Sequence, residues 1–366
     1  MNTLYLICSH SCLSQMEVPY LLNNSPMLHG ESQAGEHWAS YELDGKEVDH
    51  EPGPLGKIRV HDDYWNISDE DREWYNYDVR NTMEISTEQL DGLLNLIKDK
   101  DALKALNTMK VIKTIQETNG EKAANRYIIS NNQTALNVMQ LYAMLKLVAF
   151  QGDLTVDIGP LFETITDLEN APSVMEKLYS NPGYAAHLKL RKNRQTIMLG
   201  FSDGTKDGGY LMANWAIYKA KEKLTAISRK YGVTVIFFDG RGGPPARGGG
   251  KTHNFYASLG PTIEDEEVQL TVQGQTISSN FGTLESSQYN LEQLISAGIS
   301  NTLSDVDLSM LPENREIMED LAKLSFQAYS DFKAHPKFIS YLEHMSTLKY
   351  YAKTNIGSRP SKRGKA

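Results

Sequence analysis

The sequence predicts an α/β protein whose parallel sheet is part of a (β/α)8 barrel with abundant extra helices. Five short apolar runs rich in β-branched and aromatic residues are typical of buried strands. Segments with helical periodicity alternate with these runs, which is the pattern of parallel βα units. Polar groups follow the runs directly, and in such a barrel the loops at these strand ends assemble the active site.

The elements follow one another from strand to helix along the chain. The predicted strands are residues 127–129, 154–158, 196–199, 233–238 and 268–272. A helix is expected at about Tyr210–Tyr231, with Leu211, Trp215 and Leu224 on one side. Helical periodicity is also found at residues 86–116, 290–297, 313–333 and 337–345. We interpret apolar residues of the later helices, such as Leu321, Leu324 and Phe332, as packing faces.

The stretch Asp239–Lys251 places Arg241, Arg247 and a lysine among six glycines, directly after a predicted strand. Glycine lets the backbone approach a ligand closely, and a guanidinium group holds phosphate or carboxylate through paired hydrogen bonds. A flexible linker is the alternative, but such linkers are rich in Ser and lack an ordered frame. The pattern therefore indicates an anion site.

The end of the same stretch, Gly250-Lys251-Thr252, is similar to the end of a phosphate-binding P-loop. The first glycine of that motif would fall at Pro245, which has no N–H group to donate and a fixed φ. An arginine-based anion site is therefore the better interpretation than a nucleotide triphosphatase.

Two carboxylates, Glu163 and Asp203, also follow predicted strands. Taken singly, a carboxylate in such a position is more often a solvated loop residue or a helix cap than a metal ligand. In a barrel they would converge with Arg241 and Arg247 at the carboxyl ends of the strands. Two carboxylates near two arginines can hold Mg²⁺ or Mn²⁺ between the protein and an anionic substrate.

Several motifs, in their order and spacing, resemble phosphoenolpyruvate carboxylase. They are Pro160–Thr164 with Asp167-Leu168, Gly200–Asp203 with Lys206-Asp207, Gly240–Gly243 with Arg247–Gly250, Thr271–Gly274 and Gly357–Arg363. The resemblance runs from about residue 110 to residue 366. We therefore expect a poorly defined segment at 1–109, helical in its later part, and a partial barrel with a helical C-terminal region at 110–366.

The resemblance implies a carboxy-lyase. In the family's reaction, bicarbonate attacks the phosphoryl group of phosphoenolpyruvate to give carboxyphosphate and the enolate of pyruvate. Carboxyphosphate releases CO₂ and phosphate, and the enolate captures the CO₂ to form oxaloacetate, which supplies C4 acids to the tricarboxylic acid cycle. Glu163 and Asp203 resemble the family's ligands of Mg²⁺ or Mn²⁺. The arginines Arg241, Arg247 and Arg359 resemble its catalytic phosphate and carboxyphosphate clamps, with Gly242 and Gly243 in the substrate-binding loop. Lys206 resembles a lysine of the site for feedback inhibition by dicarboxylic acids.

The sequence also departs from the family pattern. It has no Thr-Ala-His-Pro-Thr motif, and Asp239 stands where the family often has His before Gly-Arg-Gly-Gly. A carboxylate beside an anionic substrate would repel it, so we expect Asp239 to pair with a neighbouring arginine. We expect a fragment truncated at both ends and catalytically incomplete by itself. A non-catalytic, anion-binding or decayed fragment without a partner is the alternative.

Composition excludes several other classes. The net charge of −9 and a pI of about 5.6 argue against nucleic-acid binding. No apolar run has the length of a membrane span, and residues 1–13 lack the pattern of a signal peptide, so we expect a cytoplasmic protein. Cys8, His10 and Cys12 lack a second Cys/His pair at the spacing of a zinc site, so free thiols are expected. The sequence leaves two partner chains open: another copy of this chain, or a missing N-terminal half.

Overall fold

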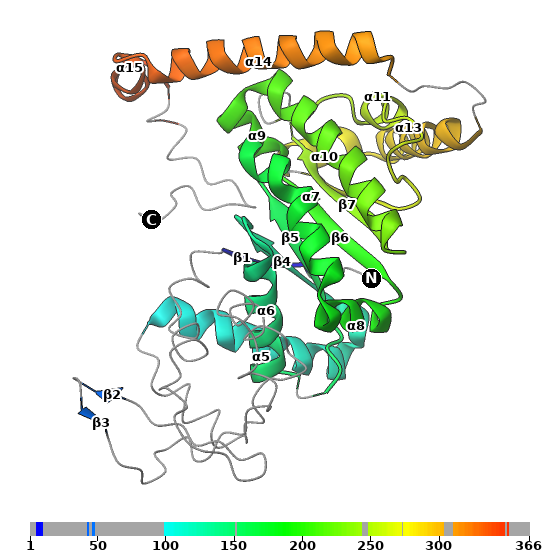
Figure 1. Cartoon of the computed structure of the whole chain (residues 1–366). Helices are drawn as coiled ribbons and strands as arrows, with labels where there is room; N and C mark the ends of the chain where they lie inside the picture. Colours follow the sequence, from blue (N-terminus) through cyan, green and yellow to red (C-terminus); the bar gives the residue numbers. More distant parts are fainter. Residues whose placement is uncertain are drawn as a thin grey trace. The chain divides into compact units, whose positions relative to one another are not determined.

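The structure is a computed structural model of the 366-residue chain. It describes the strands β1 (Tyr5–Ser9), β2 (Glu42–Leu43) and β3 (Lys46–Glu47), and residues 99–350 apart from 151, 244–247, 273, 304–309 and 348–349 (Figure 1). The side chains of Cys8, His10 and Cys12 lie outside what is described, and so do Arg247 and Arg359.

A six-stranded sheet with the order β1-β4-β5-β6-β7-β8 forms the centre of the fold. Its later strands are β4 (Arg126–Ser130), β5 (Asp157–Phe162), β6 (Arg194–Leu199), β7 (Thr234–Gly242) and β8 (Val268–Val272). All five strands predicted from the sequence are confirmed. The sixth strand, β1, pairs in parallel with β4, and Tyr5 lies opposite Arg126 at the start of the pairing. It comes from the stretch whose sequence shows the weakest signal of globular structure.

The strands β4 to β8 follow one another in chain order without a reversal. The registers of β4 with β5 and of β7 with β8 are parallel. Right-handed crossovers between neighbouring parallel strands place their helices on one face of the sheet, which is the winding of a (β/α) barrel and not of a doubly wound sheet. The α/β fold class is therefore confirmed, and closure into a barrel stays a prediction.

The helices lie between and after the strands. They are α5 (Lys100–Asn119), η3 (Glu121–Ala123), α6 (Ala135–Val148), α7 (Ile165–Ser180), α8 (Pro182–Leu190), α9 (Phe201–Gly208), α10 (Tyr210–Lys230), α11 (Thr252–Ala257), α12 (Gly274–Phe281), α13 (Leu284–Leu303), α14 (Pro312–Ala334) and α15 (Phe338–His344). The helix expected at 210–231 is confirmed, and the three expected after residue 290 correspond to α13, α14 and α15. The described part of the expected 86–116 helix lies in α5.

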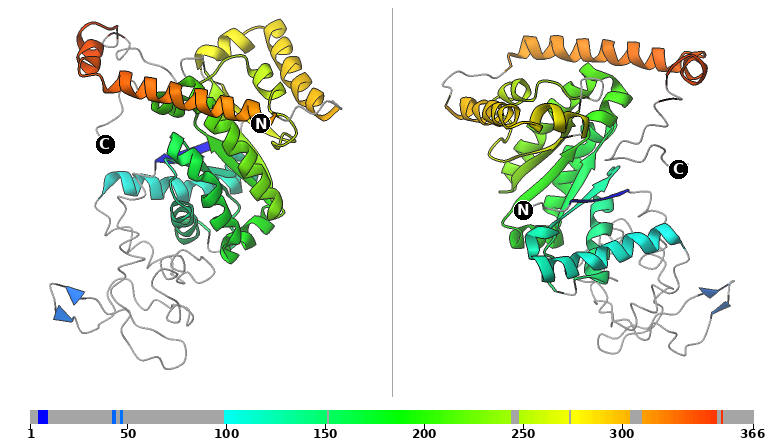
Figure 2. Two further views of the ribbon diagram at one scale, coloured as in Figure 1. Left: turned by 45° about the horizontal axis from the view of Figure 1, so that its top comes forward. Right: turned by 180° about the vertical axis from the view of Figure 1, so that it is seen from behind.

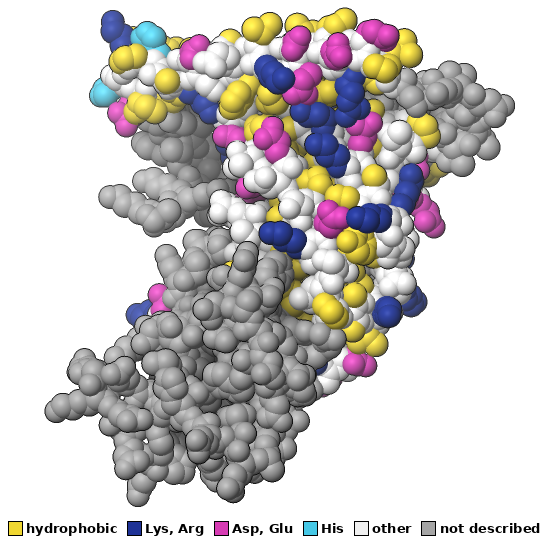
Figure 3. Space-filling view, viewed as in Figure 1, with side chains coloured by type: hydrophobic (Ala, Val, Ile, Leu, Met, Phe, Trp, Pro, Cys, Tyr) yellow, Lys and Arg dark blue, Asp and Glu magenta, His cyan; other side chains and the backbone are white. Residues whose placement is uncertain are grey.

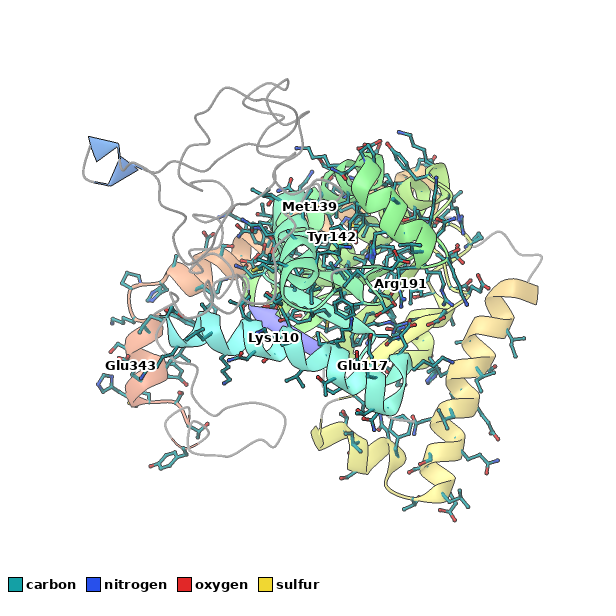
Figure 4. The ribbon with its side chains drawn as sticks, turned by 90° about the horizontal axis from the view of Figure 1, so that it is seen from below. Lys110, Glu117, Met139, Tyr142, Arg191 and Glu343 are labelled. Atoms are coloured by element: carbon teal, nitrogen blue, oxygen red, sulfur yellow. The ribbon has the colours of Figure 1, made fainter. Side chains whose placement is uncertain are left out.

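The described residues form two compact units. The first contains α5, α6, α8 and β4, and α6 contributes Met139 and Tyr142 to its interior (Figure 4). A polar chain crosses this interior: the hydroxyl of Tyr184 donates to Gln195 Oε1 at 2.8 Å, and Gln195 Nε2 donates to the carbonyl of Ile158 at 2.9 Å. Burial thus leaves these polar groups paired, as a packed core requires.

An ion network lies at the amino end of β5. Arg191 bonds Asp157 Oδ1 through Nε at 2.6 Å and Glu121 Oε1 through Nη1 at 2.8 Å. The network thereby joins the C-cap of α8, the short helix η3 and the start of β5. In barrel folds this end of the sheet serves stability, because the active site is built at the carboxyl ends of the strands.

The second unit contains α9, α10, β7 and the helices that follow. Figures 1 and 2 show α14 lying across α9 and α10. Polar contacts anchor it: Glu319 Oε2 accepts from Trp215 Nε1 at 2.6 Å and from Lys219 Nζ at 2.7 Å, and Arg315 pairs with Glu222 at 2.7 Å. None of the described helices is long and apolar enough to cross a bilayer.

The prediction that the apolar residues of the later helices form packing faces is wrong for α14. Leu321, Leu324 and Phe332 are 47%, 69% and 61% exposed, and the hydrophobic side chains along α14 are visible on the surface in Figure 3. The residue that α14 buries is Ala322. The helix docks through charged groups and a small residue, and helical periodicity alone does not show which stripe meets a neighbour.

His187 is a buried titratable group of the first unit, 2% exposed and with its ring centroid 5.0 Å from that of Tyr142. Burial, together with the nearby charges of Arg191 and Lys146, lowers the pKa of His187 to about 3. The folded protein therefore holds this imidazole neutral at pH values where an unfolded chain would protonate it.

We predict that His187 makes stability depend on pH. Its folded pKa lies below the unfolded value of about 6.5, so its contribution is complete above that value and is lost as the pH falls towards 3. Between pH 7 and pH 5 the free energy of unfolding should drop by about 1 to 2 kcal/mol because of this group.

Urea denaturation followed by tryptophan fluorescence would measure the change. His187→Gln should lower stability at pH 7 but flatten the slope between pH 7 and pH 5, whereas His335→Gln, at an exposed position, should leave the slope unchanged. Equal slopes in wild type and His187→Gln would contradict the prediction.

Candidate active site

The end of β5 fixes the backbone at Glu163. Asp167 Oδ2 accepts hydrogen bonds from the backbone N–H groups of Thr164 at 3.0 Å and Glu163 at 3.4 Å. Thr164 Oγ1 in turn accepts from the backbone N–H of Asp167 at 3.1 Å. This reciprocal cap begins α7 immediately after Glu163. Asp167 is therefore a structural residue, and the Thr-x-x-Asp spacing at 164–167 is the sequence signal for it.

Asp203 and Lys206 lie on a helix, α9, and not on the loop that the glycine-rich composition suggests. They are one turn apart, and Lys206 Nζ donates to Asp203 Oδ1 at 2.7 Å. The carboxylate lies in the first turn, where the helix dipole favours a negative charge. The Lys206 side chain is 59% exposed, so this surface pair contributes little to stability.

Glycines allow α9 to lie against the start of α7. A Cβ atom at Gly200 would lie 3.0 Å from the Cα of Glu163, and one at Gly208 would lie 2.6 Å from Ile165 Cγ1. In addition, Asp207 Oδ2 accepts from the backbone N–H of Ile165 at 2.9 Å. The segments that carry Glu163 and Asp203 are therefore in direct backbone contact, as the barrel argument expected.

These two carboxylates fit a hard divalent cation by their donor type, because Mg²⁺ and Mn²⁺ prefer oxygen ligands. Within the described part of the chain, however, no group of three or more His, Cys, Asp or Glu residues is arranged to hold a metal ion. Glu163 and Asp203 would thus supply two ligands, and water and substrate oxygens would complete the shell.

Arg241 belongs to β7, which continues through Gly242, whereas the sequence placed it in a loop. Its side chain is 4% exposed, and its guanidinium carbon lies 4.2 Å from the ring centroid of Phe255 and 5.7 Å from that of Phe201. Among the described residues, its Nε and Nη1 groups have no hydrogen-bond partner. Burial lowers the pKa of Arg241, yet arginine stays cationic in proteins.

A pocket of about 260 Å³ opens beside Arg241. Its lining comprises Arg241, Gly243, Gly250, Lys251, Thr252, His253, Leu270, Val272, Thr276, Asn280, Phe281, Tyr289, Asn290 and Leu294. A Cβ atom at Gly249 would lie 1.5 Å from the carbonyl oxygen of Gly243, so only glycine allows the two ends of the loop to meet there. Glu163, Asp203 and Lys206 do not line this pocket.

The prediction that Asp239 pairs with a neighbouring arginine is wrong. Its Oδ2 atom accepts from Lys221 Nζ and from the hydroxyl of Tyr256, both at 2.7 Å, and no described ion pair joins it to an arginine. The reason is the position of α10, which delivers a buried lysine to β7. Nothing near Asp239 in the sequence shows this contact, because Lys221 is 18 residues away.

Comparison with known proteins decides the family. The family model for phosphoenolpyruvate carboxylase matches residues 55–366. The chain belongs to the phosphoenolpyruvate carboxylase family. This match confirms the resemblance that the motifs indicated. It begins at residue 55, whereas the resemblance in the motifs begins at about residue 110.

Phosphoenolpyruvate carboxylases that are similar in sequence to this chain support the family assignment. Phosphoenolpyruvate carboxylases of Nitrosomonas eutropha and Nitrosomonas europaea are 37% and 38% identical over 267 residues, which is 70% of this chain and 28% of theirs. The enzyme of Corynebacterium diphtheriae is 36% identical over 245 residues, 67% of this chain and 27% of its own. The chain therefore spans little more than a quarter of the length of these phosphoenolpyruvate carboxylases.

We predict that Gly208 is required for the contact between α9 and α7. The Cβ of Gly208→Ala would meet Ile165 at 2.6 and 2.8 Å, and the β-branched isoleucine has little freedom to move away. The substitution should destabilise the chain by about 1 to 3 kcal/mol in a denaturation experiment.

Gly204→Ala in the same helix is the matched control. Its Cβ would make ordinary contacts at 3.4 and 3.6 Å, so the better helix propensity of alanine should leave stability equal or slightly higher. Equal effects of the two substitutions would show that α9 is not tightly held.

Proposed function

We propose that this chain forms part of the active site of a phosphoenolpyruvate carboxylase, which makes oxaloacetate and phosphate from phosphoenolpyruvate and bicarbonate. The observation that carries the proposal is the buried Arg241, whose Nε and Nη1 groups have no partner among the described residues and which lines a pocket together with Lys251. A cation with unused donors in an apolar setting favours an anionic ligand strongly.

The role we assign to Arg241 is to bind and neutralise the phosphoryl group. Phe255 and Phe201 flank its guanidinium group, so little water competes for the charge. Preorganised cations of this kind stabilise a phosphoryl group as it is transferred. Gly243 and Gly242 leave room for the substrate beside the strand end, and Arg247 and Arg359 act as further clamps in the same proposal.

We assign Glu163 and Asp203 to a divalent cation, Mg²⁺ or Mn²⁺. Bound there, the cation would supply stabilisation of the negative charge that develops on the enolate oxygen. The contact between Gly200 and Glu163 holds the two ligand-bearing segments together. Lys206 Nζ donates a hydrogen bond to Asp203 Oδ1 at 2.7 Å. In the proposal Lys206 also binds the dicarboxylic acids that inhibit the enzyme.

We further propose that the chain acts in the cytoplasm, supplies C4 acids to the tricarboxylic acid cycle and needs partner elements for turnover. These would come from another copy or from a segment equivalent to the rest of its relatives. A non-catalytic anion-binding protein is the second candidate. One observation favours it: Glu163 and Asp203 do not line the pocket beside Arg241, so an anion could bind there without the proposed metal ligands.

The metal assignment predicts weak, specific Mn²⁺ binding. An incomplete shell of two carboxylates should bind weakly, and Asp203→Asn or Glu163→Gln should each weaken binding by about tenfold. Titration followed by electron paramagnetic resonance would measure it, with the exposed Glu266→Gln as control. Equal binding by Asp203→Asn and wild type would remove Asp203 from the site.

The function predicts no oxaloacetate from the purified 366-residue chain in a malate-dehydrogenase-coupled assay with Mg²⁺ and bicarbonate. Co-expression with the remaining segments of a Nitrosomonas relative should give activity. In that complex Arg241→Gln should reduce turnover by about a hundredfold or more, the usual cost of losing a preorganised donor to developing charge.

The exposed Arg229, paired with Glu264 at 3.0 Å, provides the matched control, and Arg229→Gln should leave turnover unchanged. Turnover by the purified chain without added segments would contradict the proposed incompleteness. A complemented complex without activity would favour the anion-binding alternative.

A further inference from the structure

A buried charged cluster lies beside the anion pocket. It consists of Asp239 and Arg241 on β7, Lys221 on α10 and Tyr256 on α11. The four residues are 0%, 4%, 1% and 4% exposed. Any role of this cluster in preparing Arg241 for an anionic ligand rests on the proposed function.

The negative charge of Asp239 is compensated by two donors that bind the same carboxylate oxygen. Its Oδ2 atom accepts from Lys221 Nζ and from the Tyr256 hydroxyl, both at 2.7 Å. The ammonium group also lies 4.8 Å from the ring centroid of Phe237 and 5.4 Å from that of Phe255. Lys221 is thus enclosed by an anion and aromatic rings, away from water.

Arg241 is the other cation near Asp239. Both cations of the cluster lie against one ring: the centroid of Phe255 is 4.2 Å from the guanidinium carbon of Arg241 and 5.4 Å from Lys221 Nζ. The negative charge of Asp239 also acts on Arg241, where it opposes the lowering of the pKa by burial. Yet Arg241 Nε and Nη1 and Asp239 Oδ1 all lack hydrogen-bond partners in the described part of the chain.

A guanidinium and a carboxylate in a water-excluded interior attract each other strongly and match in geometry. Without another cation, Asp239 would therefore draw Arg241 into an ion pair and remove it from the pocket. With Lys221 in place, the cluster of two cations and one anion keeps one unit of positive charge, and that charge is on Arg241.

We propose that Lys221 is a positioning residue that takes up the negative charge of Asp239 and thereby leaves Arg241 free to bind phosphate or carboxylate. Stability alone is a poor explanation for the lysine. A buried ion pair is often no more stabilising than apolar residues of similar volume. Two of its buried neighbours on α10, Ile217 and Leu224, are apolar, and a third, Thr225, is polar but uncharged.

The test is calorimetric titration of the folded full chain with phosphoenolpyruvate and, separately, inorganic phosphate. Lys221→Met should weaken binding of both probes at least tenfold, because Asp239 then captures Arg241. Lys221→Met combined with Asp239→Asn should bind within about threefold of wild type, since the competing charge is gone. Asp239→Asn alone should bind at least as tightly as wild type.

Lys223→Met, at an exposed position two residues along α10, is the matched control and should bind as wild type does. Urea denaturation of each variant separates stability from affinity: a purely structural role of Lys221 would lower stability and leave the dissociation constant of the folded protein unchanged. If Lys221→Met does not fold, the double variant and Asp239→Asn decide.

Three results would overturn the inference while leaving the anion site intact. They are wild-type affinity in folded Lys221→Met, weak binding by the folded double variant, and weak binding by Asp239→Asn. If wild type itself binds neither phosphoenolpyruvate nor phosphate, the proposed function fails, and the role of Lys221 fails with it.

Discussion

The candidate site depends on one constraint, the burial of the positive charge of Arg241. A cation removed from water must be compensated, and here the compensation is partial: aromatic rings flank the guanidinium group, while Nε and Nη1 find no partner among the described residues. The other features of the site affect how that charge is compensated. Gly243 and Gly250 line the pocket beside it, and the apolar surroundings strengthen any contact with an anion.

The same constraint explains why Asp239 is tolerated. A buried carboxylate two residues from Arg241 would ordinarily compete with an anionic ligand for it, but α10 places Lys221 against that carboxylate. Family membership and the arrangement of the site are therefore compatible with a residue that departs from the family's usual histidine. The departure is compensated by a contact across two elements, β7 and α10, and not by a residue of the same loop.

Close backbone contact links the fold to the two carboxylates that we propose as metal ligands. Gly200 and Gly208 let α9 lie against the start of α7, and Asp207 caps α7 from α9. These contacts hold the segments that carry Glu163 and Asp203 against each other. The pocket beside Arg241 is lined by other residues, so the proposed anion site and the proposed metal ligands are separate parts of the second unit.

The sequence by itself determined the five strands β4 to β8, the helix α10 and the family. Alternation of apolar runs with helical periodicity and the order of short motifs are local signals, and they are legible without coordinates. Only the tertiary structure decided that Arg241 lies on a strand, that α9 is a helix, that Lys221 is the partner of Asp239 and that the apolar side chains of α14 are exposed. Each of these depends on which surfaces meet, and composition and periodicity carry no information about contacts between residues far apart in the chain.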